Sequence, residues 1–198
     1  MSTAHQRLPL SVTDYLEGEE VSPVKHEFVD GVVYAMAGAS VNHNRIATNS
    51  VGAFYVQLRG QRCQVFNSDT KVRIRQSHST RFYYPDLSVV CRPNPGTDSY
   101  HDEPVVIIEV ISESTRRVDE FEKRDAYLSI NSLSLYILLE TTTAAAMVYR
   151  RIDHGFAKEN YETMDAIIPL PEIGCSLNLA ECYANVDFLP TTDNDPVQ

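Results

Sequence analysis

The chain has 198 residues, of which 43% are hydrophobic, a composition typical of a globular protein with a sizeable core. It contains no stretch of about 18 uncharged apolar residues, and its start, MSTAHQRLPL, lacks the order of a signal peptide, so we expect no membrane span and a cytoplasmic location. The chain has 17 basic and 27 acidic residues, and its net charge of −10 disfavours binding to nucleic acid. We expect one domain over residues 1–189 and a frayed polar tail over 190–198.

The first third of the chain predicts a helix, a hairpin and a second helix. SVTDYLEG has the Ser-x-x-Asp form of a capping box, with Ser11 as the cap and Gly18 as the stop. In KHEFVDGVVYAMAG two short strands flank Asp30-Gly31, a pair typical of a type I′ turn. From Ser40 to Gly60, apolar residues recur at helical spacing.

The middle of the chain predicts strands in CQVFNSDTKVRI and FYYPDLSVVC, separated by the polar RQSHST, and then the apolar strand VVIIEVIS. A helix follows in STRRVDEFEKRDAYLSI, capped by Ser114 or Thr115. Two more strands, LSLYILLE and AAAMVYRRI, are linked by a Glu-Thr-Thr-Thr turn. The last segment, PLPEIGCSLNLAECYANV, predicts an irregular crossing and a short helix after Asn178.

Cysteines 63, 91, 175 and 182 form no CxxC pair and have no Cys/His ligand spacing. This pattern argues against zinc and gives no sign of a disulfide framework. We therefore expect four reduced packing residues.

Charge is unevenly distributed along the chain. The segment from Arg59 to Arg92 holds seven basic residues and only two acidic ones, Asp69 and Asp86, so it carries +5 and the remainder −15. Two interpretations stay open: a basic strip for a nucleic acid, or solvated strand edges that carry charge against aggregation. Asp69 and Lys71 in particular fit plain strand-face charges.

Glu109 lies inside the run VVIIEVIS, residues 105–112. Side chains alternate along a strand and both faces of this run are apolar, as in a central strand of an α/β protein. An ionised carboxylate buried there without a partner costs several kcal/mol, on the order found for buried ions. Glu109 should therefore be neutral, paired with a cationic side chain or bound to a cation.

Asp86 is a matching acid, because it follows Pro85 and opens the apolar end of YYPDLSVVC. If this strand pairs with the strand of Glu109, the two carboxylates converge at one edge of the sheet. Two carboxylates about 4–5 Å apart repel each other unless a cation neutralises them, and oxygen ligands suit Mg²⁺ or Mn²⁺.

An Asp after a Pro and a Glu on the next apolar strand resemble the PD-(D/E)xK nuclease signature, although Ile111 stands where that signature has its lysine. The longer pattern HEFVDGVVYAMAGAS..H, YYPDLSVVC, P.VIIEVIS.ST...D...K...Y and L.LYILLE resembles the Uma-two family of predicted restriction endonucleases, over roughly residues 24 to 185. The resemblance implies an α/β fold of the restriction-endonuclease type, a mixed central sheet flanked by helices. It also implies that the signature lysine has moved to the following helix, where Lys123 shares a stripe with Asp119 and Tyr127.

The three central residues each have a plainer interpretation. Glu109 is a metal ligand or one half of a structural ion pair, and Asp86 is a ligand or a turn residue. Lys123 is catalytic or forms an ordinary salt bridge with Asp119, four residues before it. We favour the functional role for all three, with the backbone carbonyl of Val110 as a further metal ligand.

Three other residues are supporting candidates. Through the resemblance, Glu27 in HEFVDG would add an acidic group to the site, although an exposed strand residue is an equal alternative. His43, near the start of the long helix, is better explained as a core or capping histidine. Tyr127 fits packing better than chemistry.

These residues favour a metal-dependent endonuclease that hydrolyses phosphodiester bonds of nucleic acid, most simply DNA, with Asp86 and Glu109 holding one or two Mg²⁺ or Mn²⁺ ions. Lys123 would orient or deprotonate the attacking water or balance charge in the transition state. By analogy with enzymes that cut both strands, we expect a homodimer. The alternatives are a non-catalytic binding or structural module with the same fold, and a hydrolase of small phosphoesters. The recognition sequence, the biological target and any partner methyltransferase are not specified by the sequence.

Overall fold

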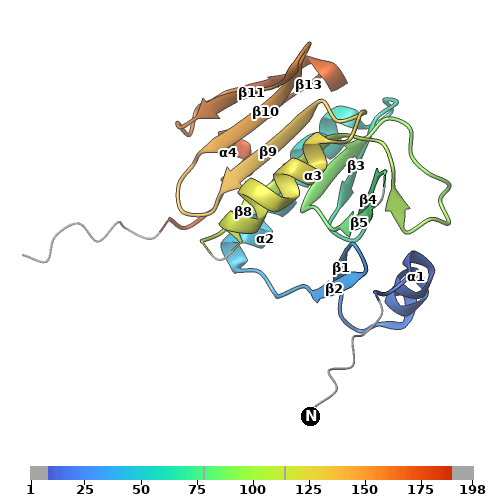
Figure 1. Ribbon diagram of the computed structural model, residues 1–198. Helices are drawn as coiled ribbons and strands as arrows, with labels where there is room; N and C mark the ends of the chain where they lie inside the picture. Colours follow the sequence, from blue (N-terminus) through green and yellow to red (C-terminus); the bar gives the residue numbers. More distant parts are fainter. Residues whose placement is uncertain (1–8, 78, 114, 189–198) are drawn as a thin grey trace, which may run out of the picture.

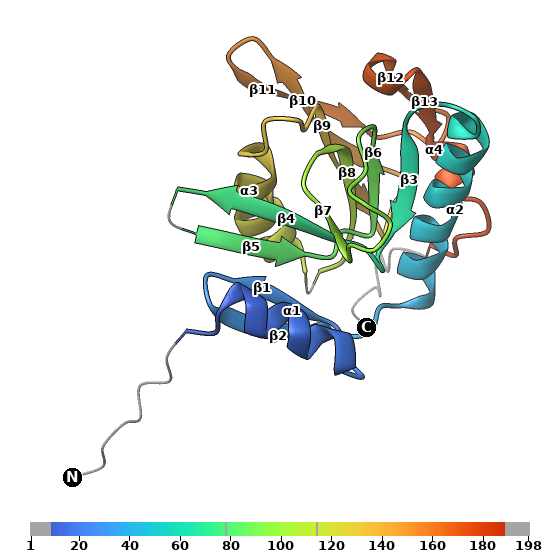
Figure 2. The same ribbon diagram turned by 90° about the vertical axis from the view of Figure 1, so that its right-hand side faces the viewer.

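The computed structural model of the protein describes residues 9–77, 79–113 and 115–188. Its largest element is a six-stranded sheet with the order β11-β10-β9-β8-β6-β3. Helices α2 and α3 lie on opposite faces of this sheet (Figure 2). The strands are β3 (Gln64–Asn67), β6 (Leu87–Val90), β8 (Pro104–Ile111), β9 (Leu135–Glu140), β10 (Ala146–Ile152) and β11 (Gly155–Tyr161).

A second sheet of five strands has the order β2-β1-β5-β4-β7 and lies beside the first (Figure 1). Helix α1 (Val12–Val21) covers one of its faces, where Tyr15, Phe28 and Phe82 form a small aromatic core. The strands are β1 (His26–Val29), β2 (Val32–Ala35), β4 (Lys71–Gln76), β5 (Ser79–Tyr83) and β7 (Tyr100–His101).

β8 is the central strand that its sequence predicts. It pairs antiparallel with β6 and parallel with β9, so the sheet is mixed. Val106, Ile108 and Val110 point into the core beneath α2 (Val41–Leu58), whereas Ile107 and Ile111 point into the core beneath α3. Glu109 lies between the latter two and therefore faces the α3 side.

The helical segment after β8 is not uniform. Its middle, η1 (Val118–Lys123), is a π-helix, and α3 (Arg124–Leu128) continues it. A π-helix inside a longer helix often marks a functional site. Of the two expected caps, Ser114 lies outside the described residues, and the Thr115 hydroxyl accepts a hydrogen bond from the Ser112 backbone N–H at 3.1 Å.

The expected cap of α1 is confirmed and its expected end is wrong. The Ser11 hydroxyl accepts a hydrogen bond from the backbone N–H of Asp14, but the helix passes Gly18 and ends at Val21. A glycine stops a helix where it adopts a left-handed conformation, and Gly18 does not. Ser22 ends the helix instead, because a residue that precedes proline disfavours the helical region.

The β1–β2 hairpin is confirmed. Asp30 and Gly31 have φ values of 52° and 92°, and positive φ at both positions is what a type I′ turn requires. A Cβ on Gly31 would lie 2.4 Å from Cβ of Pro9, so the close approach of the chain also requires glycine there. Asp30-Gly31 thus sets the register of the two strands.

Several expected elements are divided differently. CQVFNSDTKVRI forms β3 and β4 in two different sheets, and FYYPDLSVVC divides at Pro85 into β5 and β6. The polar RQSHST was expected to be a linker, yet β4 and β5 pair as far as Gln76 and Ser79. Polar strands at a solvent-facing position lack the apolar pattern that predicts a strand, which also explains why β11 was not predicted.

The crossing expected before the last helix contains a hairpin. Strands β12 (Ile167–Leu170) and β13 (Cys175–Asn178) pair antiparallel, with the short 3-10 helix η2 (Pro171–Ile173) between them. Asn178 caps the expected helix α4 (Leu179–Cys182). The expected tail over 190–198 lies outside the described residues, and none of the described helices is long and apolar enough to cross a membrane.

The expectation of four reduced cysteines is wrong for two of them. Cys63 and Cys91 form a disulfide, while Cys175 and Cys182 are free. The bond follows from pairing, because Gln64 lies opposite Val90 in the antiparallel β3–β6 pair and the two cysteines continue that register. Their separation of 28 residues carries no recognisable motif.

Candidate active site

The pairing of β6 with β8 brings Asp86 and Glu109 together. Leu87 lies opposite Ile108 in this antiparallel pair, so Asp86, just before β6, lies opposite Glu109. The backbone N–H of Asp86 donates a hydrogen bond to Oε2 of Glu109 at 3.3 Å. The two carboxylates therefore meet where β6 begins and β8 continues beyond it.

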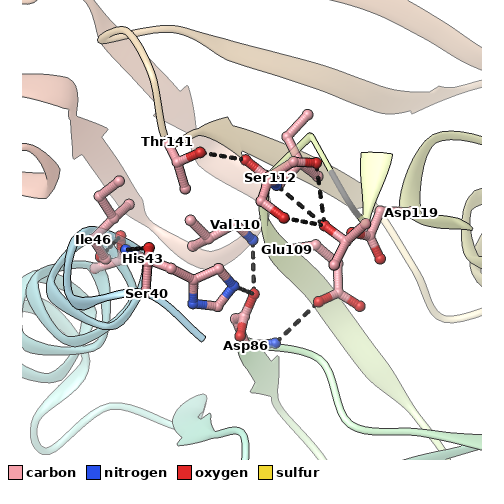
Figure 3. A network of polar contacts seen from close by, with 12 residues as sticks. Ser40, His43, Ile46, Asp86, Glu109, Val110, Ser112, Asp119 and Thr141 are labelled. Carbon is pink, nitrogen blue, oxygen red and sulfur yellow. Dashed lines mark hydrogen bonds and ion pairs between the residues drawn. The ribbon is translucent and has the colours of Figure 1, made fainter. Parts of the chain in front are cut away.

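Asp86 is held from two further directions (Figure 3). Its Oδ2 accepts a hydrogen bond from the backbone N–H of Val110 at 2.8 Å, and Nε2 of His43 lies 3.2 Å from the same oxygen. His43 reaches this point from the first turn of α2, which is capped by the Ser40 hydroxyl. These contacts fix the orientation of the carboxylate and all use Oδ2.

Glu109 is almost fully enclosed, with a relative exposure of 3%. Its Oε1 accepts a hydrogen bond from the hydroxyl of Tyr127 at 3.0 Å and lies 3.4 Å from Nζ of Lys123. Tyr127 itself is fully buried and packs against Tyr83 and Tyr136. Glu109 thus has partners, as its burial requires.

Lys123 occupies the centre of an acidic cluster. Its Nζ lies 2.8 Å from Oε1 of Glu27, 3.4 Å from Oε1 of Glu109 and 3.6 Å from Oδ1 of Asp119. Asp119, Lys123 and Tyr127 are all buried, so the predicted stripe faces the carboxylates. The wide turns of η1 carry both Asp119 and Lys123 to this face.

Burial and charge shift the titration of these groups. Burial raises the pKa of Glu109 well above its ordinary value; the charge of Lys123 opposes the shift, and those of Asp119, Asp86 and Glu27 add to it. Burial lowers the pKa of Lys123, but the carboxylates around it outweigh this and raise it well above normal. Lys123 therefore keeps its positive charge in the metal-free protein.

The pKa of His43 is raised for a similar reason. Burial lowers it, but the hydrogen bond to Asp86, the negative charges of Asp86 and Asp119 and the Val110 backbone together raise it. Its other ring nitrogen, Nδ1, is buried without a hydrogen-bond partner among the described residues. Nε2 of His43 thus pairs with Asp86, which places this expected core or capping histidine at the site.

The site as a whole carries an excess of negative charge. Glu27, Glu109 and Asp119 surround Lys123, and Asp86, which pairs with His43, adjoins Glu109. Like charges this close in a buried site are unfavourable unless a proton or a cation neutralises them.

A family model described as "Uma2: Putative restriction endonuclease" matches residues 12–180, which is most of the chain. The chain belongs to the Uma2 family. Two proteins of Synechocystis sp. are similar to it over most of their length. "Uncharacterized protein slr1290" is 33% identical over 181 residues, 90% of this chain and 94% of its own, and "Uncharacterized protein sll1609" is 30% identical over 146 residues, 72% and 81% of the two chains.

The fold of this Uma2 protein is also that of a solved structure. The crystal structure of "a putative nuclease belonging to DUF820" from Anabaena variabilis superimposes with a TM-score of 0.69 over 88% of this chain and 98% of that one, at 16% identity. The mixed sheet flanked by helices, of the restriction-endonuclease type, is therefore confirmed. The family description thus points to putative restriction endonucleases, and the solved structure shows the same fold.

The donor atoms of this Uma2 site fit a hard divalent cation. Asp86 and Glu109 offer carboxylate oxygens, and the Asp86 contacts described above leave its Oδ1 available. The Val110 N–H points toward Asp86. In a strand the carbonyl of a residue points to the same side as its N–H, so the Val110 carbonyl also points toward the Asp86 side. Among the described residues no three His, Cys, Asp or Glu side chains form a ready metal cluster, so an ion would need backbone, water or substrate ligands, as Mg²⁺ commonly has.

The Uma2 chain brings the supporting candidates to the site as well. Glu27, from the five-stranded sheet, pairs with Lys123 and is not a plain exposed strand residue. Tyr127 both packs and donates to Glu109. Asp119 was expected on one helical stripe with Lys123 and Tyr127, and it is buried with the other acids. Its spacing of four residues from Lys123 was the available signal.

Part of the basic segment of this Uma2 protein is engaged with other groups of the chain. Arg73 makes a bidentate pair with Asp102 at 2.7 Å, and Arg81 pairs with Asp30 at 3.3 Å. Lys71 is buried, not a strand-face charge, and its Nζ donates to the Tyr84 hydroxyl at 3.2 Å on the α1 side of its sheet. The arginines are thus partly neutralised by acids outside the segment.

Proposed function

We propose that the protein is a metal-dependent endonuclease that hydrolyses phosphodiester bonds of DNA. The observation that carries the proposal is the meeting of Asp86, Glu109 and Lys123 at the start of β6 and the end of β8. Two carboxylates suit a divalent ion that activates water, and a lysine beside them suits the charge of a phosphate; the family description and the fold support this assignment.

Asp86, Glu109 and the carbonyl of Val110 would hold Mg²⁺ or Mn²⁺, and Glu27 could assist a second ion. When bound, such an ion supplies a water of lowered pKa and stabilises negative charge on the phosphate. His43 and the N–H of Val110 orient Asp86, so the carboxylate keeps its direction before any ion binds. The chain thus preorganises one of the ligands.

Lys123 would act as a cation and hydrogen-bond donor at the scissile phosphate or at the attacking water. Its three carboxylate contacts keep it charged, which favours this role over that of a general base. Tyr127 is a positioning residue, because its hydroxyl holds Oε1 of Glu109 from the buried side.

The test is cleavage of supercoiled plasmid DNA with Mg²⁺ or Mn²⁺, with chelator as the blank. Single-stranded DNA, RNA and a small chromogenic phosphodiester complete the substrate series. We expect nicked and linear products with the parent and none with Lys123→Met, whereas Lys158→Met, which removes an exposed lysine on β11, should cleave normally.

Two outcomes would overturn the proposal. Metal-independent DNA binding without cleavage by the folded protein would make it a binding module. Turnover of the small phosphodiester without affinity for duplex would make it a hydrolase of another substrate class.

A further inference from the structure

β2 is an edge strand that is exposed on both of its faces. All four of its residues are exposed, with Val32 at 49%, Val33 at 43% and Tyr34 at 55%. β1 pairs with one side of it, and within the described residues no strand pairs with the other (Figure 1). Edge strands are usually protected by charge, proline or a bulge, because a free edge invites pairing with another chain. β2 has no charged residue and no proline.

The register shows which backbone groups point outward. The two-residue turn makes Val29 and Val32 a hydrogen-bonded pair, and such pairs alternate along an antiparallel ladder. Counting from Val29 and Val32, Lys25 and Met36 form the second hydrogen-bonded pair along. The N–H of Met36 donates to the carbonyl of Lys25 at 2.9 Å, as this alternation requires. The N–H and C=O groups of Val33 and Ala35 therefore point away from β1, ready for another strand.

The charge around β2 indicates what kind of chain can pair with its free edge. Residues 31–41, GVVYAMAGASV, contain no charged side chain in a chain of net charge −10. Two identical copies can meet here without like-charge repulsion, whereas a nucleic acid would need basic residues. The surface is apolar and, through its outward backbone groups, complementary to itself.

We infer that β2 pairs antiparallel with β2 of a second copy of this chain, across a two-fold axis at Tyr34. In this register Val33 lies opposite Ala35 of the partner subunit and Ala35 opposite the partner's Val33. Each of the two pairs exchanges two backbone hydrogen bonds. In this register the outward N–H and C=O groups of Val33 and Ala35 are all paired in both copies, and every pair lies within β2.

The dimer has a consequence for the nuclease site, which rests on the proposed function. Tyr34 lies opposite Glu27 in the β1–β2 pair, and Glu27 contacts Lys123. A two-fold axis normal to the sheet puts both Glu27 residues on the same face, separated by three strand spacings, or about 14 Å. Two sites so placed suit the cleavage of both strands of a duplex.

The interface is tested by sedimentation and light scattering of the full chain, without reference to cleavage. Ala35→Pro removes an outward N–H and leaves the β1–β2 bonds intact, and Val33→Lys adds a charge to the edge. We expect the parent to be a dimer and both variants monomers. Val21→Lys, at an 84% exposed valine outside the sheet, should remain a dimer. A monomeric parent, or a dimer unchanged in both edge variants, would overturn the inference.

Crosslinking tests the register. At the two-fold axis the two Cα atoms of residue 34 lie about 4.5 Å apart, within the range of a disulfide. Tyr34→Cys should therefore form a covalent dimer on mild oxidation, reversed by reductant. Val32→Cys faces Met36 of the partner subunit and should not crosslink to itself. Equal crosslinking of both variants, or none of Tyr34→Cys, would contradict the register.

Discussion

Replacing Glu109 by glutamine keeps the shape of the side chain and removes its charge. In the metal-free protein this carboxylate lies beside one lysine and three other acids, and burial raises its pKa. The charged form therefore costs free energy that glutamine avoids. Glutamine can still accept the hydrogen bond of Tyr127, but its amide group cannot accept from the Asp86 N–H as the second oxygen does.

The expected magnitude follows from these opposed effects. Relief of a buried charge is worth a few kcal/mol, on the order found for buried ions, and one lost hydrogen bond costs about 1 kcal/mol. We expect the variant in chelator to be more stable by about 0.5–2 kcal/mol. For a chain of this length each kcal/mol moves Tm by about 2–4 °C, so Tm should rise by roughly 1–8 °C.

The pH dependence of stability and its response to Mn²⁺ show whether the charge of Glu109 causes the difference. A folded-state pKa above the ordinary 4.5 means that the folded parent binds a proton which the unfolded chain has lost. The parent should therefore lose stability as pH rises from 4.5 through the folded pKa, and the variant should lose less over that range. Mn²⁺ at about 100 times its Kd should stabilise the parent by about 2.7 kcal/mol and the variant much less.

The measurement is thermal unfolding of the parent and variant in chelator and in Mn²⁺, from pH 5 to pH 8. Glu17→Gln, at an exposed position on α1, is the matched control and should shift stability by less than about 0.5 kcal/mol. A clear loss of stability of Glu109→Gln in chelator would refute the reasoning, because Glu109 would then be one half of a structural ion pair. An unchanged response to Mn²⁺ would remove it as a ligand.

Lys123→Met should abolish cleavage and leave Mn²⁺ binding, measured by calorimetry, largely intact; a large loss of affinity would instead make the lysine part of the ion site. Asp86→Asn should weaken Mn²⁺ binding at least about tenfold, or 1.4 kcal/mol, and equal affinity would exclude it as a ligand. Cys91→Ser opens a crosslink of 28 residues and should cost about 2–4 kcal/mol, measured by urea unfolding without reductant. The parent in reductant should show the same loss, and no loss in either case would mean that the bond to Cys63 does not contribute to stability.

The sequence alone was enough to predict those features that depend on residues close together in the chain. The alternation in VVIIEVIS identified a central strand, because side chains on a strand point alternately to its two faces. Asp30-Gly31 identified the hairpin, because few residue pairs accept positive φ at both positions. The spacing of Asp119, Lys123 and Tyr127 identified a helical stripe, and the structure turns that stripe toward Glu109. In each case the signal lies within a single element or turn.

Contacts between distant elements were decided only by the tertiary structure. Glu27 on β1 pairs with Lys123 at the end of η1, and His43 in the first turn of α2 pairs with Asp86 just before β6. Cys63 and Cys91 are joined because β3 pairs with β6 in one register. A local pattern specifies which face of an element is buried, but not which element covers it. That choice depends on the packing of the whole chain, so these partners carry no signal in their own sequence neighbourhoods.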